Sequence, residues 1–314
     1  MNSPIFQRSL PLVAALMLFL LASCGGGDDG ALSPTGGEVP TVNNNRNNPS
    51  SIAAVGGLEF PRVTDERVLV KRVSGSDLAL FKDGISYSIG YDDNYKLPRY
   101  VCYKMYKSNK VANLKRTTAP EGEYEYPEDT DIPADYRLKN SNDPFWNTGY
   151  DHGHMIPSAH RLSSFAANRQ TFLLSNMMPQ VNGFNARIWA TLENKINDTW
   201  NQDRFRDTLY VVTGGSYQKP EYVLRYIGNA SQGNRIPVAK YYWKAVLCKN
   251  KQGYKAIGFW LEHESNDKTN LQPYVVSIDE LERLTGLDFF CNLPDHTENQ
   301  IEAVPAKTII KSWF

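Results

Sequence analysis

The most informative segment of this chain is Tyr150-Asp151-His152-Gly153-His154-Met155-Ile156-Pro157. The 314 residues include five histidines, and three of them, His152, His154 and His160, fall within nine positions. A neutral imidazole can accept a proton near neutral pH and can bind metal ions. The clustering therefore predicts a functional site around this segment.

Amide and carboxylate groups follow the histidine-rich stretch. Ser175-Asn176-Met177-Met178-Pro179-Gln180 comes next, and Asn185 and Glu193 lie beyond it. Residues 182–200 are predicted to form a helix because apolar side chains recur at intervals of four. These side chains are Ile188, Leu192 and Ile196, with Trp189 beside them. Asn185 is placed near this apolar stripe and Glu193 on its flank. Taken alone, Asn185 could cap the helix and Glu193 could be solvated.

The remaining pattern predicts an α+β fold with a mostly antiparallel sheet core and helices. Strands are expected at 87–91, 99–106, 208–213, 236–247 and 254–260, the last two forming a hairpin. A short helix is expected at 278–285, ended by Gly286. Residues 110–148 contain four prolines among polar residues and are predicted to be a long surface excursion. The C-terminal segment to Phe314 is expected to pack against an edge of the sheet.

The N-terminus has the pattern of an export signal. Residues 10–22 are almost wholly apolar and lead into Leu21-Ala22-Ser23-Cys24, which resembles the lipobox of bacterial lipoproteins. We predict a signal peptide at 1–23 and a lipid on Cys24 that holds the protein at a membrane, on the periplasmic or cell-surface face. A plain signal peptide with an incidental Cys24 is the alternative. Residues 24–56 are predicted to be a flexible tether and 57–314 to form one domain.

Charge and cysteine content limit other interpretations. The formal net charge is zero, with a pI near 7, so any basic surface for nucleic acid must be local. Beyond Cys24 the cysteines are Cys102, Cys248 and Cys291, and an odd number allows at most one disulfide among them. The sequence indicates no oligomeric state.

Several ordered motifs together resemble the DNA/RNA non-specific endonuclease family of ββα-metal nucleases. The similarity rests on Asp151-His152-Gly153-His154, on Ser175–Gln180, and on Asn185, Trp189 and Glu193. It continues through segments 96–103, 210–215, 236–237, 243–244 and 285–290. The resemblance implies a ββα motif in which a hairpin ends at 151–154, a helix begins near Gly183, and a metal ion lies between them. It implies internal hydrolysis of DNA and RNA that leaves 5′-phosphate ends.

The resemblance also implies roles for individual residues. His154 would be the general base. Asn185 would bind one Mg²⁺, or Mn²⁺ as the alternative, through its amide oxygen, and Glu193 would hold metal-bound waters. Asn176 would orient the site or support its loop. Apart from the resemblance, we predict that Asp151 is structural and accepts hydrogen bonds that brace His154, without taking part in chemistry.

An arginine upstream of the histidine motif is expected to support the charged transition state. Arg116 is the best match to the family pattern, and Arg137 is the possible substitute because residues 118–133 form a longer segment than the family usually has. A solvated loop arginine is the alternative interpretation.

His152 is the clearest departure from the family, which usually has arginine between the Asp and the Gly. An imidazole lacks the two-pronged geometry and permanent charge of a guanidinium group. We therefore predict weaker phosphate binding or a more acidic optimum, with His152 assisting catalysis only when it is protonated.

Three other functions are compatible with parts of this pattern. Asp151, His152, His154 and His160 could form a zinc site, although Asn185 and Glu193 would then have no purpose. The chain could be a nucleic-acid-binding surface lipoprotein whose catalysis has weakened, as His152 suggests. It could also hydrolyse small phosphate esters rather than polymers.

Overall fold

The computed structural model describes residues 41–314. The predicted signal peptide and Cys24 lie outside the described residues. Within the described part, no helix combines the length and the apolar character that crossing a bilayer requires.

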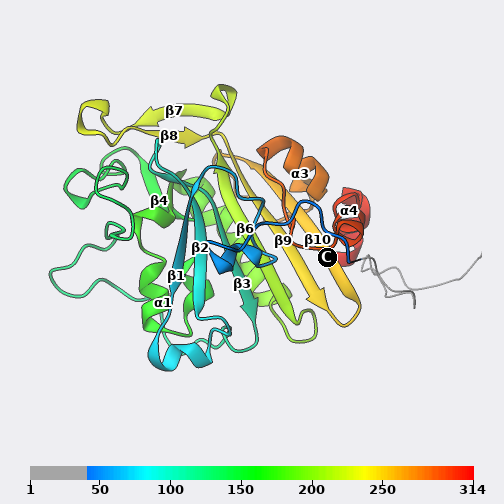
Figure 1. Ribbon diagram of the computed structural model, residues 1–314. Helices are drawn as coiled ribbons and strands as arrows, with labels where there is room; N and C mark the ends of the chain where they lie inside the picture. Colours follow the sequence, from blue (N-terminus) through cyan, green and yellow to red (C-terminus); the bar gives the residue numbers. More distant parts are fainter. Residues whose placement is uncertain (1–40) are drawn as a thin grey trace, which may run out of the picture.

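A seven-stranded sheet forms the centre of the molecule (Figure 1), and all of its neighbouring strands pair antiparallel. The α+β prediction with a mostly antiparallel core is thus confirmed. In spatial order the strands are β1 (Arg67–Arg72), β2 (Ile85–Asp92), β3 (Leu97–Tyr106), β6 (Thr208–Ser216), β9 (Tyr241–Asn250), β10 (Gly253–Glu262) and β11 (Val275–Val276).

The sheet is buried on both faces, which gives the molecule three layers. Successive side chains of a strand point to opposite faces, so Val211 joins one apolar cluster and Val212 joins the other. The first cluster includes the helical segment 184–200 and α5 (Ala306–Trp313), and the second includes α3 (Ile278–Thr285) and α4 (Asp295–Glu302). Because both faces are covered, the central strands are apolar almost continuously rather than alternating.

The ββα motif differs from its prediction in its first two elements. β4 (Tyr150–His154) is the first strand of the pair, not the end of a hairpin, and it pairs with β5 (Met177–Val181). Residues 155–176 separate the two strands and contain α1 (Phe165–Gln170). Gly153 is required at this pairing because a Cβ there would lie 2.5 Å from the Gln180 side chain. The helix then follows β5 directly.

The helix predicted at 182–200 runs from Phe184 to Trp200. α2 (Ala190–Asn194) is flanked by wider π-helical turns at Phe184–Trp189 and Lys195–Trp200. Such turns are uncommon and are often found at functional sites. The predicted apolar stripe is completely buried. Its members are Ile188, Leu192 and Ile196.

Two other predictions from the sequence can be compared with the structure. Residues 236–247 are not one strand, because β8 (Ile236–Ala239) pairs with β7 (Val223–Ile227) and β9 begins at Tyr241. The short helix is confirmed as α3, with Ser277 capping its start and Gly286 (φ 73°) ending it.

Short 3₁₀ turns occur at Ala53–Gly56, Gly75–Ala79, Asn140–Asn142, Ser158–Arg161, Leu174–Asn176, Pro220–Tyr222, Ala230–Gln232 and Gln272–Tyr274.

The folded body extends further toward the N-terminus than residue 57. Asn44 donates to Asp295 at 2.6 Å, and the buried Asn47 donates to the carbonyl oxygens of Val55 and Pro61. Because residues 24–56 contain few large apolar side chains, they were predicted to form a flexible tether. Asparagine amides instead fasten this segment by hydrogen bonds, which hydrophobicity does not reveal.

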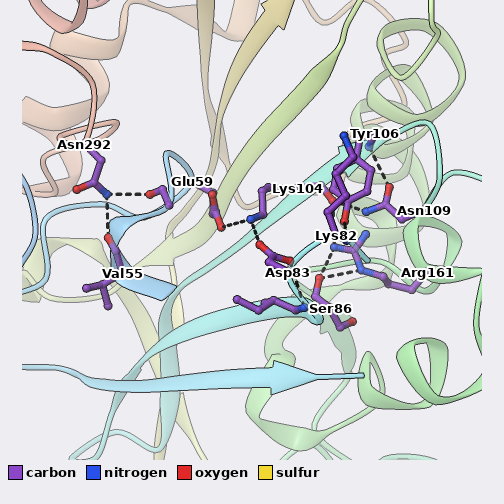
Figure 2. A network of polar contacts seen from close by, with 12 residues as sticks. Val55, Glu59, Lys82, Asp83, Ser86, Lys104, Tyr106, Asn109, Arg161 and Asn292 are labelled. Atoms are coloured by element: carbon purple, nitrogen blue, oxygen red, sulfur yellow. Dashed lines mark hydrogen bonds and ion pairs between the residues drawn. The ribbon is translucent and has the colours of Figure 1, made fainter. Parts of the chain in front are cut away.

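A polar network around the buried Glu59 ties residues 55–59 to the sheet, as Figure 2 shows. Asn292 donates to the Val55 carbonyl at 2.8 Å, and Lys104 of β3 lies between the carboxylates of Glu59 and Asp83. Burial raises the pKa of Glu59, and the nearby Lys104 charge opposes the rise. Losing Lys104 would therefore leave a buried carboxylate without its counter-charge.

The C-terminal helix packs as predicted near the β10–β11 edge. Ile309 and Trp313 of α5 join the same apolar cluster as Val275 of β11. The Trp200 indole donates to the Trp313 carbonyl at 3.0 Å, which links this helix to the helix of the ββα motif. The three cysteines of the described chain are free and buried, so no disulfide forms among them.

Candidate active site

A cavity of about 1150 Å³ opens between β4, the start of the 184–200 helix and the long 110–148 segment. Five residues expected at the site from the sequence line it together. They are Arg116, His152, His154, Asn185 and Glu193.

His154 presents an unprotonated nitrogen in this cavity. The ring is hydrogen-bonded to the backbone of His152, and its Nε2 atom is shielded from solvent without a hydrogen-bond partner among residues 41–314. Burial, with a smaller contribution from the Arg116 charge, lowers the pKa of His154 to about 3. The imidazole is therefore neutral at physiological pH and can accept a proton through Nε2.

Asn185 is oriented by Asp151. A carboxylate can only accept hydrogen bonds, so the Asn185 Nδ2 group must be the one that lies 2.9 Å from Asp151 Oδ2. Asn182 donates to the same oxygen at 3.0 Å. The amide oxygen of Asn185 is consequently turned away from Asp151 and is available as a ligand. Oxygen atoms of this kind suit a hard divalent cation such as Mg²⁺.

Glu193 is a largely buried carboxylate with an unused oxygen. Its Oε1 atom makes no hydrogen bond in the described chain and lies 3.9 Å from Lys244 Nζ. Burial raises the pKa of Glu193 to about 7, while Lys244 and a hydrogen bond from Trp189 oppose the rise. The alternative interpretation, that Glu193 is a solvated surface group, is therefore wrong.

Lys244 is a site residue to which the sequence analysis gave no role. It is completely buried on β9, where its Nζ donates to Thr213 at 3.0 Å and lies 3.9 Å from the centre of the Trp189 ring. Burial lowers the pKa of Lys244 to about 8, and Glu193 opposes this. The position of a lysine within an apolar strand could have indicated a functional role for Lys244. Its partner Glu193 is distant along the chain, so the contact could not be predicted from the sequence.

The structure distinguishes between the two candidate arginines. Arg116 lines the cavity, lies 4.5 Å from the Phe172 ring centre and is 3.9 Å from Glu125. Its side chain is 52% exposed, which leaves it free to reach an incoming phosphate. Arg137 instead bonds to Glu128 and to the Ile132 carbonyl, and it is not part of the cavity wall.

His152 is held from three sides. Its ring stacks on Tyr126 with centres 4.0 Å apart and on Phe145 with centres 4.4 Å apart. Its Nε2 atom lies 2.8 Å from Asp143 Oδ2. The carboxylate accepts, so Nε2 carries the hydrogen, and Nδ1 can donate only when the ring is protonated.

Asn176 is buried behind the site and does not line the cavity. Its side chain accepts from the Ile156 amide and donates to the carbonyls of Ile156 and Thr171. These bonds close the two ends of the 155–176 loop on each other. Of the two roles expected for Asn176, this geometry supports the loop.

The alternative zinc site is not assembled. His160 bonds through Nδ1 to the Tyr103 hydroxyl at 3.0 Å and through Nε2 to the Glu193 carbonyl at 3.2 Å. The His152 Nε2 atom is directed to Asp143 instead. Within residues 41–314 the ligand atoms of the four proposed zinc ligands do not converge.

Aromatic side chains in the cavity wall were missed by the sequence analysis. Trp146 and Tyr124 line the cavity, yet they are 76% and 61% exposed. Both come from the 110–148 segment, which was predicted only as a surface excursion. That segment also buries Ile132 and Leu138 in the core. It is therefore part of the site and not a detached loop.

A family model described as DNA/RNA non-specific endonuclease matches residues 71–296. The chain belongs to the DNA/RNA non-specific endonuclease family. Its members are enzymes that hydrolyse nucleic acids, and they depend on a divalent metal ion. The resemblance found in the histidine, asparagine and glutamate motifs is thus confirmed at the level of the family.

Individual relatives agree with this assignment. The chain is 35% identical over 180 residues to a nuclease of Syncephalastrum racemosum, which covers 54% of this chain and 55% of that nuclease. It therefore spans little more than half of that relative's length. It is 26% identical over 225 residues to a nuclease of Serratia marcescens, covering 70% of this chain and 78% of the relative.

A solved structure shares the fold. The crystal structure of the EndoG/EndoGI complex contains a chain that matches with a TM-score of 0.54 and 23% identity. The match covers 72% of this chain and 87% of the other.

Proposed function

We propose that this protein is an endonuclease that hydrolyses internal phosphodiester bonds of DNA and RNA with one divalent ion, Mg²⁺ or alternatively Mn²⁺. The observation that carries the proposal is the pairing of two groups in one cavity. His154 offers an unpartnered, unprotonated nitrogen, and Asn185 offers an amide oxygen whose direction is set by Asp151.

Each side chain then has a distinct role. His154 Nε2 takes the proton from the attacking water, and Arg116 donates to a phosphate oxygen as negative charge develops there. Asn185 would hold the ion and Glu193 would hold its waters, and the Lys244 charge favours the ionised form of Glu193. A bound divalent cation would neutralise charge on the phosphate and on the leaving oxygen.

His154 can serve as a base although its pKa is low in the free protein. Burial and Arg116 both disfavour the imidazolium ion. A phosphate anion bound beside the ring would offset the Arg116 charge and raise its proton affinity during the reaction. The lowered pKa thus keeps His154 unprotonated at neutral pH, as a general base must be before it takes the proton of the attacking water.

We further propose that the enzyme is exported and held at a membrane through a lipid on Cys24. The support is the apolar segment at residues 10–22 followed by Leu21-Ala22-Ser23-Cys24. A nuclease that degrades both nucleic acids without sequence preference would be harmful inside its own cell, which agrees with export.

One observation favours a second candidate function, a nucleic-acid-binding lipoprotein with weakened catalysis. The position expected to clamp phosphate holds His152, and Asp143 lies 2.8 Å from it. A carboxylate there repels phosphate unless His152 is protonated. The intact set of His154, Asn185 and Glu193 argues for the active enzyme.

The test is cleavage of supercoiled plasmid and of RNA by the chain from residue 25 onward, with Mg²⁺ and with a chelator. Cutting of both polymers should require the metal and should fall at least a hundredfold in His154→Ala. His296→Ala removes an exposed histidine outside the cavity and should leave the rate unchanged. Folded protein that binds but does not cut either polymer would establish the second candidate, and cleavage of small phosphate esters alone would establish the third interpretation made from the sequence.

A further inference from the structure

Three carboxylates come together between α3 and α4, away from the catalytic cavity. Asp279 and Glu282 lie one turn apart on α3, and Glu302 is the last residue of α4. An oxygen atom from each of the three lies within 4.8 Å of the others. Oxygen ligands of one calcium ion lie 2.3–2.6 Å from it, so two of them can be at most about 5 Å apart. The three oxygens are close enough to share an ion.

Glu302 provides an independent indication of a missing partner. Glu302 is buried, with a relative exposure of 5%. Its Oε1 atom has no hydrogen-bond partner anywhere in residues 41–314. The charged groups acting most strongly on it are other carboxylates, namely Glu282, Glu298, Asp288 and Asp279. A buried carboxylate in such surroundings requires either a proton or a cation.

The pKa values describe the state without a cation. Burial raises the pKa of Glu302 to about 10 and that of Glu282 to about 8, and the neighbouring carboxylates add to both. Burial and mutual repulsion therefore favour protonated carboxylates when no cation is bound. A divalent cation would supply the missing positive charge and allow both groups to ionise.

We propose that Asp279, Glu282 and Glu302 bind a calcium ion that joins α3 to α4. Calcium accepts irregular sets of carboxylate ligands, whereas Mg²⁺ requires a nearly regular octahedron and gives up water reluctantly. Glu282 Oε1 already accepts from the Phe289 amide at 2.7 Å, which fixes that carboxylate and leaves its second oxygen for the ion. The exposed Asp279 gives the ion access from solvent.

The proposed site also supports the docked N-terminal segment. Asn45 donates to Asp288 at 3.2 Å and to Glu298 at 3.1 Å, and both carboxylates raise the pKa of Glu302. Calcium would lower the repulsion among these five acids and so stabilise the surface on which Asn45 rests. The site is structural, and the proposal does not depend on the proposed nuclease activity.

Calcium titration followed by thermal unfolding tests the proposal. After chelator treatment at pH 7, calcium well above its Kd should raise the Tm by about 5 °C. Glu302→Gln should abolish the shift, because glutamine imitates the protonated acid and keeps the packing but cannot bind the ion as a carboxylate does. Glu280→Gln is the matched control on α3, since Glu280 pairs with Arg283 at 2.6 Å, and it should retain the full shift.

The candidate catalytic metal site must be excluded as the source of the shift. In Asn185→Ala the calcium-dependent rise should persist, and calorimetry should still show one bound ion that Asp279→Asn removes. If Glu302→Gln does not fold, Asp279→Asn carries the thermal test as well, because Asp279 is exposed. No calcium shift in the original protein, or a shift lost in Asn185→Ala and kept in Glu302→Gln, would overturn the proposal and leave protons as the cluster's partners.

Discussion

His152 replaces a permanently charged residue with one whose charge depends on pH. Asp143 fixes the hydrogen on Nε2, so the other nitrogen becomes a donor to phosphate only in the protonated ring. The two aromatic rings that sandwich His152 restrict it to this orientation. Its contribution to catalysis therefore depends on a proton that arginine would not need.

The cleavage rate should consequently fall as the pH rises from 5.5 to 8.5, because His152 loses the proton that lets its second nitrogen donate. In His152→Arg this fall should disappear and the rate above pH 7 should rise, because guanidinium remains charged. The measurement is kcat/KM on plasmid between pH 5.5 and pH 8.5 with Mg²⁺ held saturating. A profile with the same shape in both proteins would show that His152 does not act through its proton.

Trp146 also acts as a single residue, because its exposed ring can stack on an unpaired base. Aromatic stacking on a nucleobase is worth about 1–3 kcal/mol. Trp146→Ala should therefore weaken binding of a single-stranded oligonucleotide roughly 5- to 150-fold, measured by fluorescence anisotropy in chelator. Phe165→Ala removes another exposed aromatic residue, 55% exposed and outside the cavity, and should change the Kd little.

At the scale of elements, Asn176 connects two parts of the ββα motif without contributing to its chemistry. Its side chain satisfies one amide and two carbonyls that are all buried. Asn176→Ala should lower the free energy of unfolding by about 2–4 kcal/mol, since these groups would lose their partners. Urea denaturation measures this, with the partly exposed Asn197→Ala as the control that should change stability by less than about 0.5 kcal/mol.

His263 joins strands β5 and β8, which belong to two separate two-stranded sheets, and makes this junction sensitive to acid. Nε2 accepts from the Val181 amide at 2.8 Å, and Nδ1 donates to the Ala239 carbonyl at 2.9 Å. Burial lowers the pKa of His263 to about 4. The unfolded chain therefore binds a proton between about pH 6.5 and 4 that the folded chain does not.

Stability from His263 is accordingly present above about pH 6.5 and is lost as the pH falls toward 4, by up to about 3 kcal/mol. His154 and His160, both with pKa values lowered to about 3 by burial, contribute with the same sign. Unfolding free energies measured across this range should fall less steeply in His263→Gln than in the original protein. Equal slopes would mean that His263 is already protonated in the folded state.

Elements with a regular local pattern were predictable, and those fixed by distant partners were not. The helix that ends at Trp200 was predicted from apolar residues repeating at intervals of four. Strands β2, β3, β6 and β10 were predicted from the pattern of apolar residues within each segment. The partner of β4 is separated from it by the 155–176 loop, and the end of β8 depends on its pairing with β7. Such pairings are decided by packing across the whole fold.

The candidate site divides in the same way. The sequence supplied His154, Asn185, Glu193 and Arg116 through family motifs, and the structure brings all four to one cavity. The sequence did not supply Lys244, whose partner Glu193 is distant along the chain, or Trp146, which lies in a segment with no regular pattern. Contacts between distant residues, rather than residue types, set these roles.

For the whole molecule, the docked segment at 41–47 sets where the described chain begins relative to the catalytic cavity. The Val42 carbonyl accepts from the Asp295 amide at the start of α4, so the described chain begins beside α4. In Figure 1, α4 and β4 lie at opposite ends of the body, and the two helical layers cover opposite faces of the sheet. With the proposed lipid on Cys24, the chain would join the body on the side away from the catalytic cavity, so that long polymers could reach the cavity without meeting the bilayer.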